Sequence, residues 1–142
     1  MHYLIYVSQA AHPMSQTELA EILAKSRDYN TTDNITGLLI YKLDPDTDRG
    51  NFMQLLEGEK NQLDDAFRRI CDDKRHHTKV VLEEGEIAER HCPDWTMGFR
   101  DIDTSELQAF DGFSDLGTDS FWDRVNSGEV NNALEVMLSV VL

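Results

Sequence analysis

The sequence predicts an α+β fold, in which elements in the order β-α-β-β-α-β-β form one sheet covered on one face by two helices. Three observations support this. Five short apolar segments have strand character, two longer segments between them have helical periodicity, and turn residues lie at the boundaries. The chain has 142 residues, 40% of them hydrophobic, which suits one domain with a sizeable core.

The first strand and the first helix have clear residue patterns. Residues 3–8, YLIYVS, are apolar and sufficiently β-branched for a buried strand. Side chains alternate along a strand, so Tyr6 faces the side opposite to Ile5. Residues 15–18, SQTE, form a capping box, which predicts a helix running to about Tyr29. The inward stripe of that helix comprises Leu19, Ile22, Leu23 and Ser26.

A hairpin of two further strands is expected next. Residues 35–42 and 51–56 are apolar, and the polar segment DPDTDRG, residues 44–50, connects them. The second of these strands contains one amide, Gln54, among apolar neighbours. A buried primary amide has two donors and two acceptor lone pairs, and leaving them unmet costs roughly 1–3 kcal/mol. Gln54 is therefore expected to have specific hydrogen-bond partners.

The remaining elements complete the expected sheet. A second helix is predicted over residues 61–73, a fourth strand over 78–87, and a short fifth strand over 95–99. The inner face of the second helix carries Leu63, Phe67 and Ile70. This order of elements suggests a ferredoxin-like sheet with both helices on one face.

Residues 101–142 are expected to form a C-terminal helical extension to a domain of residues 1–100. Helical patterns occur over 119–125 and 130–142. The second helix has an apolar stripe of Val130, Leu134, Met137, Leu138 and Val141. Such a stripe must pack on the free face of the sheet or on another subunit.

Composition excludes several classes of function. The net charge is −14, and residues 101–142 contain nine Asp or Glu against one Arg. Phosphate contacts need clustered Lys and Arg, so nucleic-acid binding is not expected. A solvated acidic surface explains this charge, and an acidic tail that docks a basic partner is the alternative. No apolar stretch approaches the roughly 20 residues that span a bilayer, and the N-terminus does not resemble a signal peptide.

Two cysteines, Cys71 and Cys92, have no paired spacing, which fits free thiols in a reducing cytoplasm. A zinc site would combine them with His76, His77 and His91. Their spacings match no standard zinc pattern, so no metal is expected.

Several polar or large side chains are not needed for packing. They are Tyr6, Asn30, Gln54, and the pair Trp95 and Met97 on the predicted last strand. Each also has a purely structural explanation, such as a core ring for Tyr6 or a helix C-cap for Asn30. The sequence contains neither a phosphate-binding glycine loop nor a Gly-x-Ser-x-Gly elbow, so an enzyme is not the natural interpretation.

In order and spacing, these segments resemble the BLUF family of flavin-dependent blue-light sensors. The matching stretches are YLIYVS, RDYN, NITGLLIY, FMQLLEGE, RRICDDKRHH and PDWTMGF, which together cover about residues 2–100. The resemblance implies a ferredoxin-like fold that holds FAD non-covalently between its two helices. FMN is the other possible flavin, and only the resemblance favours FAD over it. It also implies that Tyr6 is the photoactive tyrosine and Gln54 the switching glutamine.

The resemblance assigns further residues to the flavin. Asn30 matches the asparagine at the polar edge of the ring, and Ile22 and Ile70 match residues that sandwich it. Arg69 and His76 match positions near the ribityl and phosphate groups. Trp95 and Met97 match the pair that exchange places beside the glutamine. Two departures stand out: Tyr29 occupies the place of a second asparagine, and the 44–50 loop is longer than usual, which should alter only the hairpin tip.

In this family, blue light excites the oxidised flavin. The resemblance implies that an electron and a proton then leave Tyr6 and afterwards return to it. The hydrogen bonding of Gln54 is left changed, which gives a small red shift. An amide suits this place because it donates and accepts at once. The change is expected to pass through the last strand to the stripe of 130–142, which would respond as a two-state element.

The chain is expected to be a stand-alone cytoplasmic sensor that signals through self-association, as a homo-oligomer, or through a separate protein partner. One alternative is a light-independent ferredoxin-like module that binds a ligand or a partner. Another is a small flavin-dependent enzyme.

Overall fold

The computed structural model of the chain describes residues 1–102, 113, 115–130 and 132–141. Its elements are β1 (His2–Ala10), α1 (Gln16–Asp33), β2 (Thr36–Asp44), β3 (Arg49–Gly58), α2 (Lys60–Asp72), β4 (His76–Glu86), β5 (Gly98–Ile102), α4 (Asp119–Asn126) and α5 (Ala133–Val141). The predicted α+β class and order of elements are confirmed.

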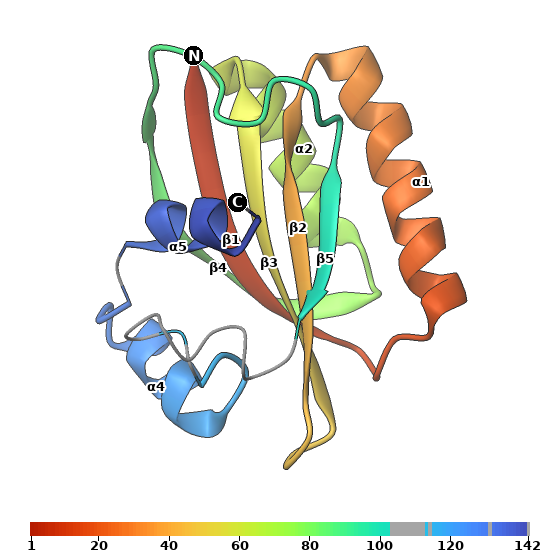
Figure 1. Cartoon of the computed structure of the whole chain (residues 1–142), viewed down its shortest axis with the longest axis vertical. Coiled ribbons are helices and arrows are strands. Elements are labelled where there is room, and N and C mark those ends of the chain that lie inside the picture. The colour runs from red at the N-terminus through yellow and green to blue at the C-terminus, as the bar shows by residue number, and fades with distance from the viewer. Residues whose placement is uncertain (103–112, 114, 131, 142) are drawn as a thin grey trace.

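One five-stranded sheet, in the order β4-β1-β3-β2-β5, forms the centre of the molecule. The first four strands pair antiparallel, and β5 adds to the edge parallel to β2. Helices α1 and α2 cover one face, and α4 and α5 lie on the other (Figure 1). The ferredoxin-like arrangement with two helices on one face is thereby confirmed.

The helix-side core forms because β1, β2 and β3 present alternate side chains to α1 and α2. Tyr6 of β1 lies there opposite Gln54 of β3, and Ile5 and Leu55 face the other way, as the alternation predicts. The buried apolar residues on the helix side include Leu4, Leu19, Leu23, Leu39, Phe52, Leu56, Leu63 and Ala66.

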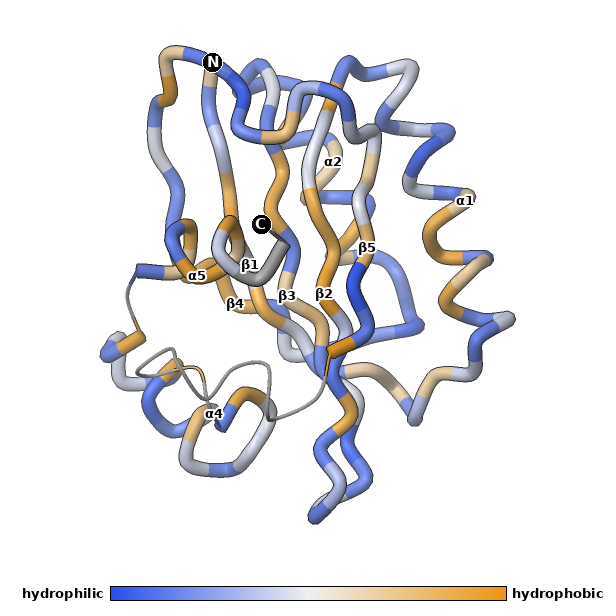
Figure 2. The backbone as a smooth tube through the Cα atoms, viewed as in Figure 1, coloured by the Kyte–Doolittle hydropathy of each residue, from blue (hydrophilic) through white to orange (hydrophobic). Residues whose placement is uncertain are grey.

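The C-terminal extension packs on the free face of the sheet, one of the two places expected for its apolar stripe. Figure 2 shows hydrophobic stretches along the central strands and on α5. The second core combines Ile5, Val7, Leu38, Ile40, Met53 and Leu55 of the sheet with Phe113, Leu116, Phe121, Trp122, Val125, Ala133, Val136 and Met137 of the extension. Four residues of the predicted stripe pack against this core: Met137 is buried, and Val130, Leu134 and Leu138 are partly buried. Because α5 begins at Ala133, its most buried residues are Ala133, Val136 and Met137; Val130 precedes the helix, and the Val141 side chain lies outside the described residues.

A buried polar cluster also joins the extension to the sheet. Lys42 of β2 is 1% exposed, and its ammonium donates to the Leu116 carbonyl at 2.6 Å. On β3, the fully buried Asn51 accepts from the Trp122 indole N–H at 3.1 Å. Gly117 passes so close to Asn51 that a Cβ there would lie 2.1 Å from the Asn51 amide nitrogen. The contact between sheet and extension is therefore specific as well as hydrophobic.

The predicted last strand is placed too early in the sequence. Trp95 and Met97 precede β5, which begins at Gly98 and runs to Ile102. Of the segment 95–97, the Trp95 carbonyl accepts from Gly37 of β2, but the Thr96 and Met97 carbonyls turn to side chains of α1. The apolar pattern of residues 95–99 predicted one strand, but the backbone hydrogen bonds in the first part of this segment leave the sheet.

The first helix also extends further than predicted. It ends at Asp33, and its C-cap is Asn34, which adopts the left-handed conformation with φ 56°. The C-cap explanation of Asn30 is therefore wrong. Asn30 lies inside the helix, and its side chain is not needed to cap it.

Candidate functional site

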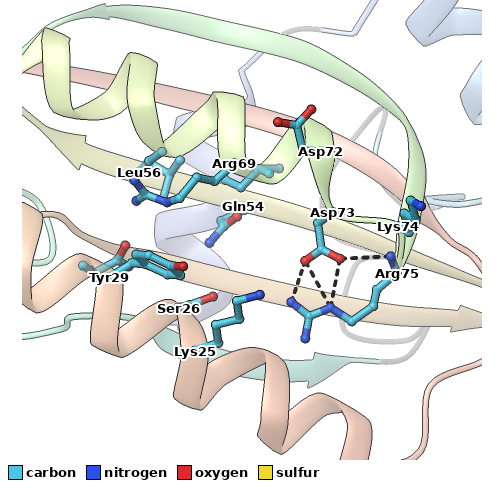
Figure 3. Close-up of a pocket in the computed structure, with 13 residues that line it drawn as sticks. Lys25, Ser26, Tyr29, Gln54, Leu56, Arg69, Asp72, Asp73, Lys74 and Arg75 are labelled. Atoms are coloured by element: carbon cyan, nitrogen blue, oxygen red, sulfur yellow. Dashed lines mark hydrogen bonds and ion pairs between the residues drawn. The ribbon is translucent and has the colours of Figure 1, made fainter.

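A cavity of about 420 Å³ opens between α1 and α2, with the sheet as its floor (Figure 3). Its volume lies in the usual range for small-molecule sites. The lining residues from α1 and β3 are Lys25, Ser26, Tyr29, Asn30, Gln54 and Leu56. Those from α2 and the segment after it are Ala66, Arg69, Ile70, Asp72, Asp73, Lys74 and Arg75.

A second, smaller cavity of about 50 Å³ adjoins the first and reaches β1. Its lining includes Tyr6, Ile22 and His76, and it shares Gln54 and Ile70 with the larger cavity. All seven residues that the resemblance assigns to flavin binding therefore line one cavity or the other. They are Tyr6, Ile22, Asn30, Gln54, Arg69, Ile70 and His76.

Gln54 has a partner at each end of its amide. The Tyr6 hydroxyl donates to Gln54 Oε1 at 2.5 Å, and Gln54 Nε2 donates to Met97 Sδ at 3.4 Å. Burial, followed by the negative charge of Asp73, raises the pKa of Tyr6 well above its ordinary value, so the phenol keeps its proton. A thioether sulfur is a weak acceptor. The Nε2 end can therefore exchange its partner at little cost, whereas the Oε1 end holds a strong donor.

Met97 and Trp95 occupy different environments. Met97 is 1% exposed beside Gln54, whereas Trp95 is 38% exposed. The Trp95 ring lies against Gly98, where an added Cβ would be 2.9 Å from Trp95 Cε3. In this structure Met97 is the inward member of the pair, a choice that the sequence left open.

Asn30 connects α1 to the segment that carries Met97. Its side chain is buried, lines the larger cavity, and donates from Nδ2 to the Thr96 carbonyl at 2.6 Å. Arg27, one turn earlier, donates twice to the Met97 carbonyl, at 3.0 and 3.1 Å. Sequence reasoning did not identify Arg27, since its acceptor belongs to an irregular segment.

Charged side chains surround the mouth of the larger cavity. Arg69 donates to Asp33 at 2.9 Å, and its guanidinium lies 4.3 Å from the centre of the Tyr29 ring. Asp73 forms a multiple ion pair with Arg75 (Figure 3). Partial burial alone would raise the pKa of Asp73, but the hydrogen bonds from Arg75 outweigh it and lower the pKa to about 2.

Five charged residues at this mouth were not singled out from the sequence, namely Lys25, Asp72, Asp73, Lys74 and Arg75. The spacing of Lys25 and Tyr29, four residues apart on one helix, was the available signal. Tyr29, noted as a departure from the family pattern, becomes the platform under Arg69. No residue of the 44–50 loop lines the two cavities, in agreement with the expectation that this loop leaves the pocket unaltered.

His76 joins β4 to β1 and α2. Its Nε2 lies 3.0 Å from the Ile70 carbonyl, which can only accept, so Nε2 carries the proton. Its Nδ1 then accepts from the Ser8 hydroxyl at 2.6 Å. Burial, followed by the charge of Lys79, lowers the pKa of His76 from 6.5 to about 4. The ring is neutral and fixed in one tautomer at neutral pH.

This lowered pKa predicts a loss of stability on acidification. Between a pKa of 6.5 in the unfolded chain and about 4 in the folded chain, the unfolded state binds a proton that the folded state does not. The free energy of unfolding should therefore fall as pH drops from about 7 to about 5, and urea titrations measure it. In a His76→Asn variant the pH dependence should decrease by up to about one proton. An unchanged slope would contradict a neutral, buried His76.

The donor set of the two cavities fits a flavin nucleotide. Apolar side chains of Ile22 and Ile70 come from opposite helices, and the amides of Asn30 and Gln54 offer donors and acceptors to a polar ring edge. Cationic side chains at the mouth suit phosphate groups. Among the residues that the structure describes, no group of three His, Cys, Asp or Glu side chains forms a metal site, and no helix is long and apolar enough to cross a membrane.

Comparison with known proteins identifies subunits of photoactivated adenylate cyclases as relatives of this chain. The chain is 41% identical over 87 residues to the photoactivated adenylate cyclase subunit alpha of Euglena gracilis, covering 61% of this chain and 8% of that protein. It is 36% identical over 95 residues to the subunit beta of Euglena longa, covering 66% of this chain and 10% of the relative. The chain thus spans about a tenth or less of these relatives.

Solved structures agree over nearly the whole chain. The photo-activated state of BlsA superposes with a TM-score of 0.74 at 27% identity, over 99% of this chain and 95% of that one. The dark state of BlrB, a BLUF protein, gives 0.67 at 25% identity, over 91% and 96%. The family model for sensors of blue light using FAD matches residues 1–98. The chain therefore belongs to the BLUF family of FAD-binding blue-light sensors.

Proposed function

We propose that this blue-light sensor switches through the Gln54 amide, which exchanges hydrogen-bond partners between Tyr6, Met97 and FAD. The observation that carries the proposal is the continuous chain of hydrogen bonds from Tyr6 through Gln54 to Met97, in which Gln54 lines the 420 Å³ cavity and Tyr6 the smaller one beside it. Bound FAD would supply the absorption of blue light and a transient electron acceptor.

The residues that would hold FAD come from both helices. Ile22 of α1 and Ile70 of α2 would pack against the ring, and Asn30 would bond its polar edge. Arg69, already oriented by Tyr29 and Asp33, supplies positive charge toward the phosphate groups. These assignments rest on the lining of the cavities and on the family pattern.

Tyr6 and Gln54 would carry out the exchange of hydrogen bonds. The Tyr6 phenol is neutral and donates to Gln54 Oε1, so it has a defined acceptor when it loses an electron and releases its proton. The amide then rotates or tautomerises and presents the opposite donor and acceptor ends when the proton returns. Met97 Sδ loses its donor in this exchange, which marks the side of Gln54 where the change begins to spread.

The output would pass through the sheet to the C-terminal extension. Gln54 faces the helices, but its neighbours Met53 and Leu55 face the core that the extension covers. A shift of β3 would also alter the bond between Asn51 and Trp122. We propose that light loosens this contact and changes self-association or the binding of a separate protein.

Hydrogen exchange of the full chain tests the output. Truncation at residue 101 would expose the apolar face of the sheet, so the intact chain is the better sample. Amides of α4 and α5 should exchange faster under blue light than in darkness. A Gln54→Leu variant is the control and should show no difference. Equal exchange of the wild-type helices in light and darkness would contradict the route through the extension.

Purification and illumination test the proposal as a whole. The protein should bind FAD, appear yellow, and show a small, reversible red shift under blue light. A protein that binds no flavin would favour the light-independent ferredoxin-like module. Lasting reduction of the flavin with a donor would favour a flavin-dependent enzyme. We propose that the chain has no catalytic activity of its own, because the family model that it matches is that of a sensor of blue light.

The cellular setting is part of the same proposal. Cys71 is exposed and Cys92 is buried, and both are free thiols. Free thiols agree with a reducing compartment, so we propose the cytoplasm as the site of action. A homo-oligomer, or a complex with a separate partner, would receive the signal from the extension.

A further inference from the structure

The connection between β4 and β5 joins the two cores of the molecule. It crosses the end of the sheet that lies near the N-terminus (Figure 1). Cys92, in its middle, is buried in the core under the extension, and Met97, at its end, is buried in the helix-side core beside Gln54. The residues between them have no regular secondary structure. Something other than a strand ladder must therefore hold this connection in place.

A buried carboxylate holds its first part. Glu57 lies at the end of β3, three residues beyond Gln54, and is 0% exposed. It accepts from the backbone N–H of His91 at 2.7 Å, from the backbone N–H of Cys92 at 2.8 Å and from His91 Nδ1 at 2.9 Å. A carboxylate buried away from water is tolerated only with such donors, and charge-assisted bonds are the strong ones.

Arg90 strengthens the same anchor from the connection itself. Its guanidinium donates to the Glu57 carbonyl and to the Thr36 hydroxyl, both at 2.8 Å, and to the Asn34 carbonyl at 2.6 Å. The start of β2 and the end of β3 are thus tied to one point of the connection. We call Glu57 and Arg90 together the loop anchor.

The bonds continue from the loop anchor to Met97. The Cys92 carbonyl accepts from the Trp95 N–H at 3.2 Å, and the Trp95 carbonyl accepts from the Gly37 N–H at 3.0 Å. Asn30 and Arg27 then hold the next two carbonyls of the chain. Each bond fixes a short stretch, so the place of Met97 depends on where the connection starts.

We propose that Glu57, supported by Arg90, is a positioning residue that holds Met97 against Gln54 in the dark. The pairing of β3 with β1 and β2 uses backbone groups and does not need this carboxylate. The side chain of Glu57 instead binds the connection. The effect on Met97 stands by itself, and its consequence for the light response rests on the proposed function of Gln54.

A Glu57→Gln variant tests the proposal in the full, FAD-bound chain. The new amide has one acceptor oxygen, and its NH₂ group would face N–H donors, so at least one bond is lost. Glu59→Gln is the matched control, because Glu59 is exposed and the charge change is the same. With ¹³C-methyl methionine, the Met97 signal, assigned through Met97→Leu, should shift or broaden in Glu57→Gln and stay in place in Glu59→Gln.

The rate of dark recovery provides a second measurement. Loss of the contact between Met97 and Gln54 should change that rate by about tenfold in Glu57→Gln, equivalent to about 1.4 kcal/mol in barrier height. Should Glu57→Gln fail to fold, Arg90→Met removes the three bonds that Arg90 donates to Thr36, Glu57 and Asn34 and leaves the Glu57 carboxylate intact. A Met97 signal at the wild-type position in the folded variant would overturn the proposal. A wild type without any red shift would instead overturn the function of Gln54, and the NMR result would still decide the role of Glu57.

Discussion

Replacing Gln54 by Leu is expected to abolish the light-induced red shift and to leave FAD bound. Leu is similar in size but has no donor or acceptor, so neither Tyr6 nor Met97 can exchange a partner through it. The walls supplied by Ile22 and Ile70 are untouched, which keeps the cofactor in place. Difference spectra recorded before and after blue light, together with the flavin content of the purified variant, measure both parts.

The same variant should also be less stable. Its Tyr6 hydroxyl stays buried without the acceptor it has in the wild type, which costs about 1–3 kcal/mol. Gln16→Leu is the control, because Gln16 is exposed at the start of α1 and should keep both the shift and the stability. A normal red shift in Gln54→Leu would remove Gln54 from the mechanism.

Replacing Gly37 by Ala should prevent stable folding. A Cβ at Gly37 would lie 1.9 Å from the backbone oxygen of Leu55, on the strand paired with β2. That oxygen can move only if the central pairing of β2 and β3 opens. A loss of more than about 4 kcal/mol is expected, which is a large part of the roughly 5–15 kcal/mol of a typical domain.

Gly58→Ala is the matched control for this change. The nearest atoms to a Cβ at Gly58 lie 3.4 Å away, which is ordinary contact. This variant should unfold in urea close to the wild-type midpoint, whereas Gly37→Ala should be found in the insoluble fraction or show no cooperative transition. A Gly37→Ala protein of wild-type stability would show that the strands can separate here at little cost.

The sequence predicted the fold well wherever periodicity alone decides the outcome. The alternation in β1 placed Tyr6 and Ile5 on opposite faces, and the capping box placed the start of α1. The extension was predicted as helical, but the start of α5 was not, because Val130 continues the apolar pattern of a helix that begins three residues later. A pattern of side chains does not show where the backbone bonds change direction.

The site was predictable as a set of residue types but not as a set of bonds. Asn30 was identified, but its acceptor, the Thr96 carbonyl, belongs to a segment without any periodic signal. Glu57 and Arg75 were missed because a charged residue at the end of a strand or helix usually lies in solvent. The donors to Glu57 are distant in sequence and Asp73, the partner of Arg75, lies in irregular chain, so only the folded arrangement shows that these charges are paired, Glu57 in the interior and Arg75 at the cavity mouth.

The two faces of β3 have a consequence for how such a sensor can diverge. Even-numbered positions such as Gln54 face the helix-side cavities where we propose that light is detected, and odd-numbered ones such as Met53 and Leu55 face the extension. Residues that face the cavities thus alternate one by one along β3 with residues that face the extension. Descendants could therefore acquire a new recipient of the signal by changing every second residue, while the photochemistry stays intact.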